Sequence, residues 1–476
     1  MDLVELIIQI IVVADVIFIL SILFTEKNPS KIAAWAIVFI VLPILGFILY
    51  LFIGQTFYSK HAFMIKGVKD EEAQEVYAID KENADKEPNP EYRSIIRSLQ
   101  NVGGFGYTYT NDVKLFTLGE DKFKAFYDDL RAAKECIHLE YYIIRNDELG
   151  NELMSILTEK VKEGVEVKLL TDDFGWGKGP KKAIKAFKQA GGDFALFHRV
   201  IILMLSPKKN NRNHRKLAVI DGKIAYCGGF NIGDEYLGKG PLGFWRDTAV
   251  RITGLGVYPI HVRFQMDWEY ASGKPMGDHL SRLYDFENIE NCGDVRLLTV
   301  SGGPDVAEFN PVKMQYLELI NRSKKTLYMH TPYFIPHEAL IDALTLAAAR
   351  GVDVRVIIPD KPDHMFVFWN NISSAYTLMK NGVKVYMYNR GFVHSKTMVA
   401  DGEFCSVGSA NFDDRSLVLN FETNQLILSK DIGKQMDDAF LEDLEYCTQY
   451  SPEEFEKLSA SKKLRIVVSR LFSNLA

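Results

Sequence analysis

A ten-residue pattern occurs twice in this chain, and this repeat limits the possible folds more than any other feature. Residues 213–222 read Asn-His-Arg-Lys-Leu-Ala-Val-Ile-Asp-Gly, and residues 393–402 read Val-His-Ser-Lys-Thr-Met-Val-Ala-Asp-Gly. The apolar residues after each lysine predict a β-strand, whose alternation would place the His and the Lys on one face. The Asp-Gly pair predicts the turn of a hairpin. Two parts of the chain should therefore share one local structure.

The correspondence continues downstream of each predicted hairpin. Gly228-Gly229-Phe230-Asn231 follows the first turn, and Gly408-Ser409-Ala410-Asn411 follows the second. An acidic residue comes next in each half, Asp247 in the first and Glu422 in the second. One His-x-Lys on a strand would be compatible with a solvated surface, but two copies with the same downstream order indicate a duplicated functional unit.

The segments upstream of the two motifs also repeat, in the order strand, helix, glycine and strand. We predict strands at 136–144 and 165–170 around a helix at 149–163, and strands at 326–335 and 352–358 around a helix at 337–350. This order defines a βαβ unit. We therefore predict an α/β fold of two domains, with mixed, largely parallel sheets flanked by helices. The boundary should fall at 290–295. Because neither half holds two such histidines, the site should lie between them.

These residues resemble the phospholipase D superfamily and, within it, the bacterial cardiolipin synthases. The resemblance covers nearly the whole chain. It rests on two His-x-Lys-x4-Asp motifs, on the run from 228 to 236 and on Ser301-Gly302-Gly303-Pro304. The residues of the two motifs are His214, Lys216, Asp221, His394, Lys396 and Asp401. The resemblance implies two phospholipase D-type domains with one active site between them.

The resemblance also implies a role for each histidine. One imidazole attacks phosphorus and becomes phosphatidyl-histidine, while the other protonates the leaving alkoxide and later deprotonates the incoming alcohol. By analogy the nucleophile is His214 and the acid/base is His394, although the near-symmetry of the halves leaves the reverse assignment open. Asp221 and Asp401 belong to the signature, but their place in Asp-Gly turns favours a structural over a catalytic role.

Further residues complete the expected site. Asn231 and Asn411 are expected to donate hydrogen bonds to the phosphoryl oxygens, and Asp247 and Glu422 resemble the residues that hold the imidazoles. The motif lysines can supply the positive charge that other phosphotransfer enzymes take from a metal ion. The sequence has no clustered carboxylate-histidine ligand set, so we expect neither metal nor cofactor. The other eight histidines are expected to have ordinary packing or surface roles.

Two apolar runs precede these domains. Residues 3–24 and 33–53 are each about as long as a bilayer core is thick, which predicts a transmembrane helical hairpin within residues 1–55. A polar linker at 56–104, expected to be solvated, leads to the first domain at 105–290 and the second at 291–476. We expect a multi-pass protein of the bacterial plasma membrane. Lysines near the hairpin and five scattered cysteines favour a cytoplasmic catalytic part.

The expected substrates are phosphatidylglycerol and membrane lipids. The resemblance implies condensation of two phosphatidylglycerols into cardiolipin and glycerol. Hydrolysis by a phospholipase or a nuclease is the alternative, and the formal charge of −6 argues against a nucleic-acid partner. A non-catalytic scaffold is disfavoured because both motifs are intact. Oligomeric state stays open.

Two further segments are candidates for lipid contact. Residues 201–209, an apolar run followed by a basic pair, could dip into the membrane interface or form a buried strand. Residues 462–476 predict an amphipathic helix with Leu464, Val467 and Val468 on its apolar face. That helix would either lie in the membrane interface or pack on the catalytic body.

Overall fold

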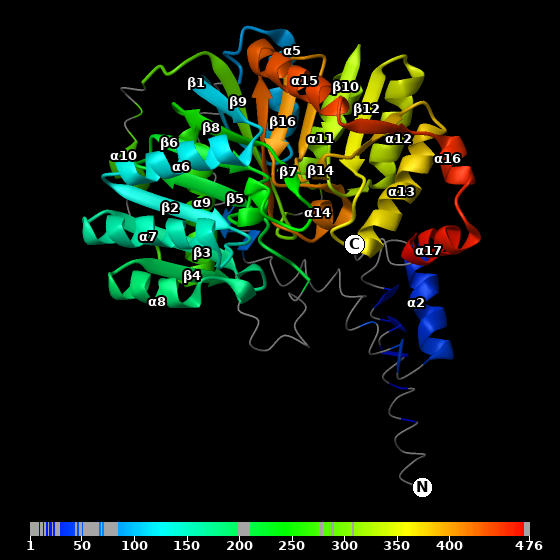
Figure 1. Cartoon of the computed structure of the whole chain (residues 1–476), viewed down its shortest axis with the longest axis horizontal. Helices are drawn as coiled ribbons and strands as arrows, with labels where there is room; N and C mark the ends of the chain where they lie inside the picture. The colour runs from blue at the N-terminus through cyan, green and yellow to red at the C-terminus, as the bar shows by residue number, and fades with distance from the viewer. Residues whose placement is uncertain are drawn as a thin grey trace.

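The structure is a computed structural model of the whole chain (Figure 1). It describes residues 84–198, 210–276, 279–284, 286, 290–306 and 309–470, together with residues 9, 13, 16, 17, 19, 20, 22, 23, 29–42, 45, 46, 50, 66, 67, 69 and 70. Much of the predicted hairpin, all of 201–209 and residues 471–476 of the predicted C-terminal helix therefore lie outside the described part. Within that part, no helix is both long and apolar enough to cross a membrane. Helix α2 (Pro29–Val41) belongs to the second apolar run.

The first half of the catalytic part alternates strands with helices, as predicted. Its strands are β1 (Gly104–Phe116), β2 (Cys136–Tyr141), β3 (Glu166–Asp172), β4 (Asp193–Phe197), β5 (Lys216–Ile220), β6 (Ile224–Gly228), β7 (Phe244–Arg246) and β8 (Ala249–Thr253). Helix α5 (Pro90–Gln100) belongs to the linker before this half. The helices of the half itself are α6 (Gly119–Ala132), α7 (Glu148–Lys162), α8 (Lys181–Gln189), α9 (Val257–Ser272) and α10 (His279–Leu283), with short 3-10 turns η3 (Gly175–Lys178) and η5 (Asp234–Leu237).

The second half repeats this arrangement. Its strands are β9 (Val295–Gly302), β10 (Thr326–His330), β11 (Phe334–Ile335), β12 (Asp353–Pro359), β13 (Lys384–Tyr388), β14 (Gly391–Val393), β15 (Thr397–Ala400), β16 (Phe404–Gly408), β17 (Phe412–Asp413), β18 (Glu422–Leu428) and β19 (Cys447–Tyr450). Its helices are α11 (Pro311–Arg322), α12 (Glu338–Ala349), α13 (Met365–Met379), α14 (Asp414–Val418), α15 (Lys430–Leu444), α16 (Pro452–Glu456) and α17 (Ala460–Arg470).

One large mixed sheet runs through both halves. Its strand order is β19-β13-β12-β10-β15-β16-β18-β9-β1-β8-β6-β5-β2-β3-β4. Both predicted βαβ units are present, since β2 pairs in parallel with β3, and β10 with β12. The prediction of largely parallel sheets was wrong. Parallel pairing otherwise joins only β3 to β4 and β12 to β13, whereas every other neighbour pair in this sheet, within the described residues, is antiparallel. Each motif hairpin and the strands beside it add antiparallel pairs after the βαβ unit.

Helices cover this sheet and divide the core. Figure 1 shows α6, α7 and α8 over the first-half strands and α11 and α12 over those of the second half. Each of these layers encloses its own apolar cluster. A third cluster combines strand residues of both halves with α9 and α15, for example Val219 with Val399 and Phe440. The two halves are therefore joined by the β1–β9 pairing and by a common core.

The linker at 56–104 is not simply solvated, contrary to the prediction. Helix α5 buries Tyr92, Ile95, Ile96 and Leu99 against the second half. Upstream of it, Lys66, Gly67 and Asp70 are buried as well. A polar composition concealed these contacts, because Lys66, Asp70 and Glu87 are charged and yet buried and paired inside the protein.

Candidate active site

The two motif hairpins form as predicted, but the histidines lie outside the strands. β5 pairs with β6 and β15 with β16, and each turn has positive φ at Asp and Gly, with 51° at Asp221 and 64° at Gly222. The first strand begins at Lys216 and the second at Thr397. Each histidine therefore lies in the segment that leads into its strand, where its backbone is free to pair with another part of the chain.

That pairing crosses between the two halves. The backbone N–H of His214 donates to the carbonyl oxygen of Phe421 at 2.9 Å, and the N–H of His394 donates to the carbonyl oxygen of Arg246 at 2.7 Å. β14 also lies parallel to β7, so the segment before each motif is held against the segment before the acid of the other half. Each histidine consequently faces an acid from the opposite half.

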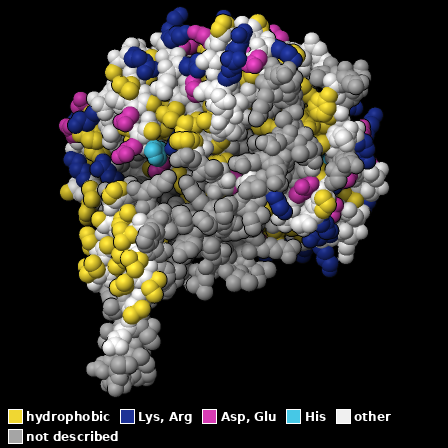
Figure 2. Space-filling view, turned by 180° about the vertical axis from the view of Figure 1, so that it is seen from behind, with side chains coloured by type: hydrophobic (Ala, Val, Ile, Leu, Met, Phe, Trp, Pro, Cys, Tyr) yellow, Lys and Arg dark blue, Asp and Glu magenta, His cyan; other side chains and the backbone are white. Residues whose placement is uncertain are grey.

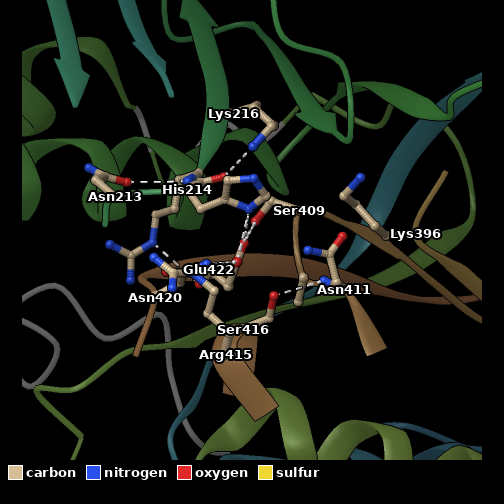
Figure 3. A network of polar contacts seen from close by, with 12 residues as sticks. Asn213, His214, Lys216, Lys396, Ser409, Asn411, Arg415, Ser416, Asn420 and Glu422 are labelled. Carbon is tan, nitrogen blue, oxygen red and sulfur yellow. Dashed lines mark hydrogen bonds and ion pairs between the residues drawn. The ribbon is translucent and has the colours of Figure 1, made fainter. Parts of the chain in front are cut away.

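His214 is held by Glu422. The imidazole Nδ1 lies 2.9 Å from Oε1 of Glu422, and Figure 3 shows this carboxylate pointing at the ring with Ser409 beside it. The Ser409 hydroxyl donates to Oε2 at 2.5 Å, and the Asn420 side-chain amide donates to Oε1 at 3.3 Å. The Tyr142 ring packs edge-on against the imidazole, with 5.0 Å between the two ring centres. A carboxylate can only accept here, so Nδ1 carries the proton and Nε2 keeps its lone pair.

His394 is held in the same way by Asp247. Its Nδ1 lies 2.6 Å from Oδ2 of Asp247, whose other oxygen accepts the N–H of Thr248 at 2.7 Å. The Trp245 ring lies 5.5 Å from the imidazole. Gly229 is required beside this acid, because a β-carbon there would lie 2.1 Å from Oδ1 of Asp247. The second imidazole thus also presents Nε2 as its unoccupied nitrogen.

Both motif lysines are buried beside these rings. Lys216 Nζ donates to the carbonyl oxygen of His214 at 2.6 Å, and Lys396 Nζ lies 3.0 Å from Nδ1 of His394. Burial lowers the pKa of Lys216 to about 7 and that of Lys396 to about 8. An ammonium that has lost its hydration is well suited to a bound anion, because the anion restores the lost stabilisation.

The pKa values of both histidines lie below neutrality. Burial lowers the pKa of His214 to about 4, against the opposing effect of Glu422, and burial together with Lys396 lowers the pKa of His394 to about 3. Two lysines and two carboxylates already balance one another. A bound phosphodiester adds one negative charge, which favours protonation of one imidazole. The substrate can therefore recruit the proton that the acid step requires.

A cavity of about 450 Å³ opens onto these groups. His214, His394, Asn231 and Asn411 all line it, so the structure brings together the predicted histidines and asparagines. The Asn231 side-chain amide donates to the Tyr236 hydroxyl at 2.9 Å. The other residues that line the cavity are Tyr142, Ile143, Arg145, Phe174, Arg212, Glu235, Tyr236, Trp245, Tyr333, Asp363, His364, Val367, Arg415 and Asn420.

The motif aspartates lie at the far ends of their hairpins from the histidines. The carboxylate of Asp221 accepts the backbone N–H groups of residues 134, 135 and 136, at 2.7–3.2 Å. Asp401 accepts those of residues 324, 325 and 326 in the same way, at 2.7–2.9 Å. Each aspartate thereby fastens its turn to the start of β2 or β10. This geometry supports a structural role for the two aspartates over a catalytic one.

Several residues of the site were not predicted. Tyr142, Trp245 and Tyr236 contact the imidazoles, and His364 lines the cavity although an ordinary surface role was expected for it. Tyr236 and Trp245 lie in or beside the repeated motifs, which was the available signal. Three other histidines lie away from the cavity: Nδ1 of His138 is 2.7 Å from Nε2 of His261, and Nδ1 of His330 is 3.0 Å from the Thr397 hydroxyl.

The described residues contain no group of three or more His, Cys, Asp or Glu side chains arranged to hold a metal ion. The arginines of the cavity wall, Arg145, Arg212 and Arg415, supply positive charge there, and the motif lysines supply it beside the imidazoles.

The fold and the paired motifs define a duplicated phospholipase D-type protein. The sequence matches the family described as "Cardiolipin synthase, PLD-like domain" over residues 126–240 and 316–444, and "Phospholipase_D-nuclease N-terminal" over residues 7–55. It is 41% identical over 482 aligned positions to a cardiolipin synthase of Listeria innocua, covering 99% of each chain. It is 39% identical to one of Staphylococcus aureus, covering 97% of this chain and 94% of the relative. The chain belongs to the cardiolipin synthase family of phospholipase D-like proteins.

A solved structure has the same fold at low sequence identity. The phosphatidylserine synthase of Haemophilus influenzae superposes with a TM-score of 0.60 at 15% identity, covering 80% of this chain and all of that one. The duplicated arrangement of the two halves is thus shared beyond the close relatives.

Proposed function

We propose that this protein transfers a phosphatidyl group between two phosphatidylglycerol molecules, giving cardiolipin and glycerol. The observation that carries the proposal is the pair of crossed imidazole–carboxylate contacts, His214 with Glu422 and His394 with Asp247. Both imidazoles line one cavity, and a buried lysine contacts each of the two histidines. Membership of the cardiolipin synthase family supports the choice of substrate and of transfer over hydrolysis.

In the first step His214 Nε2 attacks phosphorus of the donor lipid. The new P–N bond forms as the bond from phosphorus to the headgroup glycerol oxygen breaks, and His394 Nε2 gives its proton to that oxygen. Glycerol leaves, and the phosphatidyl group stays on His214. Lys216 and Lys396 stabilise the charge that develops on the phosphoryl oxygens, and Asn231 and Asn411 orient them.

In the second step the neutral His394 accepts a proton from a headgroup hydroxyl of the acceptor lipid. The resulting oxygen nucleophile attacks phosphorus, the P–N bond breaks, and cardiolipin leaves with His214 again neutral. Glu422 stabilises the cationic phosphatidyl-imidazole through Nδ1, and Asp247 does the same for protonated His394. Family resemblance supports this assignment of the two histidines, whose environments are nearly equivalent. No metal ion or cofactor is required.

We further propose that the chain is anchored by its N-terminal hairpin and faces the cytoplasm. Figure 2 shows hydrophobic side chains gathered on the projecting N-terminal part, and Ile37, Ile40 and Val41 of α2 are exposed there. Figure 1 places α17 near the end of this helix. Helix α17 packs on α13 through Ile466 and exposes Leu464, Val467 and Val468, as an interfacial helix would.

The test is lipid analysis of bilayers that contain the purified protein and headgroup-labelled and acyl-labelled phosphatidylglycerol. Transfer gives labelled cardiolipin together with free glycerol, in a one-to-one ratio, in the presence of chelator. Phosphatidate without cardiolipin would instead show that the protein is a hydrolase, and no consumption of lipid would contradict both.

A further inference from the structure

A lysine of the linker is buried at the junction of the two halves. Lys66 Nζ lies 2.5 Å from the Asp70 carboxylate, 2.8 Å from that of Asp305 and 3.2 Å from that of Asp267. Its side chain is 1% exposed. The ammonium also lies 5.2 Å from the centre of the Phe421 ring. This residue lies in the linker, eleven positions after residue 55 where the predicted membrane hairpin ends, yet it contacts both catalytic halves.

The charges around Lys66 form a closed network. Arg263 pairs with Asp70 and with Asp267, both at 2.8 Å, and Arg215 pairs with Asp267 at 2.6 Å. Three cations therefore face three carboxylates, and the carboxyl of Glu140 beside them has its pKa raised to about 8 by burial and by Asp267. Opposite charges must balance in such a place, because an unpaired buried charge is strongly destabilising. The linker contributes one charge of each sign to this balance.

The network leads to the catalytic imidazole through Arg215. Its guanidinium donates to the Thr423 hydroxyl at 2.9 Å and to the carbonyl oxygen of Glu422 at 3.3 Å. Glu422 in turn holds His214, and Arg215 is the neighbour of His214 in the chain. Any displacement of Arg215 should therefore change the position of both members of the imidazole–carboxylate pair.

The Ser301-Gly302-Gly303-Pro304 segment closes the network on the other side. Arg215 donates to the carbonyl oxygen of Gly302 at 3.3 Å. A β-carbon at Gly303 would lie 2.4 Å from Oδ1 of Asp305, and one at Gly67 would lie 2.4 Å from the backbone oxygen of Asp305. Glycine at position 67 lets the linker approach this segment closely, and glycine at position 303 leaves room for the Asp305 carboxylate.

We propose that Lys66 and Asp70 are positioning residues of the active site. By completing the network around Asp267, they fix Arg215 and, through it, the Glu422–His214 pair. The linker that contains Lys66 and Asp70 thus belongs to the catalytic unit. The inference rests on the proposed function only because phosphatidylglycerol turnover is its readout. Turnover is measured as the sum of the cardiolipin and the phosphatidate formed.

The experiment compares Lys66→Met, Asp70→Asn and the double variant in the full chain. Each single substitution unbalances the network, so we expect kcat to fall at least about tenfold with little change in KM. The double variant leaves two cations facing two carboxylates, so kcat should recover above that of either single variant. Lys66→Arg keeps the charge and should retain most of the activity.

The pH profile separates positioning from a purely structural role. Excess negative charge in Lys66→Met should move the acid limb of kcat/KM to higher pH, and Asp70→Asn should move it to lower pH. The charged groups that face His214 are Glu422, Lys216 and Lys396, and all three are unaltered in these variants. The double variant should return the limb close to its original position.

The matched control is an exposed pair at the same spacing. Lys124 and Asp128 lie 2.9 Å apart on α6, and their side chains are 80% and 56% exposed. Lys124→Met and Asp128→Asn should leave both kcat and the pH profile unchanged.

The proposal is overturned by wild-type kcat and an unshifted pH profile in both linker variants, Lys66→Met and Asp70→Asn. A second pair of results also overturns it. In that case Lys66→Met and Asp70→Asn lose activity only in proportion to the loss of folded protein. In addition, the folded double variant has a wild-type pH profile and a kcat no higher than that of either single variant. A wild type that consumes no phosphatidylglycerol would instead contradict the proposed function.

Discussion

His214 and Glu422 lie 2.9 Å apart across 208 residues of chain, and each belongs to a different half of the duplicated fold. His394 and Asp247 form the mirror pair, 2.6 Å apart across 147 residues. Each half therefore supplies the imidazole of one pair and the carboxylate of the other. The active site is consequently a property of the assembled halves, and neither half alone contains a complete pair.

The crossed pairs predict the effect of removing one carboxylate charge. Glu422→Gln and Asp247→Asn should each lower kcat by roughly a hundredfold or more, because the partner imidazole loses its orientation and the stabilisation of its charged form. Steady-state kinetics with labelled phosphatidylglycerol measures this. Glu403→Gln, which alters an acid of the second hairpin turn, is the matched control. Equal activity of Glu422→Gln and wild type would show that the contact is not used.

The two histidines should differ in the intermediate they allow. His214→Ala and His394→Ala should each lower turnover by roughly 10⁴-fold or more, since neither imidazole can perform the role of the other. Only the His394 variant should accumulate phosphatidyl-enzyme, detected by intact-mass analysis after brief exposure to lipid. An adduct on His394 in the His214 variant, and none in the reverse case, would invert the assignment.

The lowered lysine pKa values predict an unusual alkaline limit. Activity requires protonated Lys216 and Lys396, whose pKa values of about 7 and 8 are lowered by burial, so kcat/KM should fall as pH rises from neutrality. An ordinary lysine would stay charged to about pH 10. Because a bound anion favours the charged lysines, the fall in kcat should begin at higher pH than the fall in kcat/KM. Identical alkaline limbs for both parameters would contradict this reasoning.

The motif aspartates should affect stability more than chemistry. Asp221→Asn weakens the bonds to the N–H groups of residues 134–136 and should destabilise the protein by roughly 1–3 kcal/mol. We expect a melting temperature lower by a few degrees and a kcat of the remaining folded enzyme close to wild type. Asp401→Asn should behave alike. A large fall in kcat at unchanged melting temperature would instead assign these residues to catalysis.

The C-terminal helix should contribute to membrane binding. Deletion of residues 462–476 from a chain that also lacks residues 1–55 should weaken its binding to vesicles containing phosphatidylglycerol. The reason is that the exposed face of Leu464, Val467 and Val468 and the adjacent basic residues are lost. Activity on detergent-dispersed lipid should persist. Sedimentation with vesicles measures the difference, and equal binding with and without the tail would refute the role.

The predictions from local pattern were the most reliable. Alternating apolar residues and Asp-Gly turns depend on neighbours in the chain, so both hairpins and both βαβ units could be found from the sequence. The prediction of largely parallel sheets was wrong because strand order is set by the packing of the whole sheet. The prediction of a solvated linker was wrong for a similar reason, because two partners of Lys66, Asp267 and Asp305, lie far from it in the chain.

The sequence alone determined which chemical groups are available: each half of the duplicated chain supplies one imidazole, one lysine, one asparagine and one acid. Only the tertiary structure decided which acid serves which imidazole. Local sequence places Asp247 after the first motif and Glu422 after the second, but the backbone pairing of His214 with Phe421 and of His394 with Arg246 exchanges them. These contacts form between residues far apart in the chain, so they depend on how the two halves pack, which no local pattern encodes.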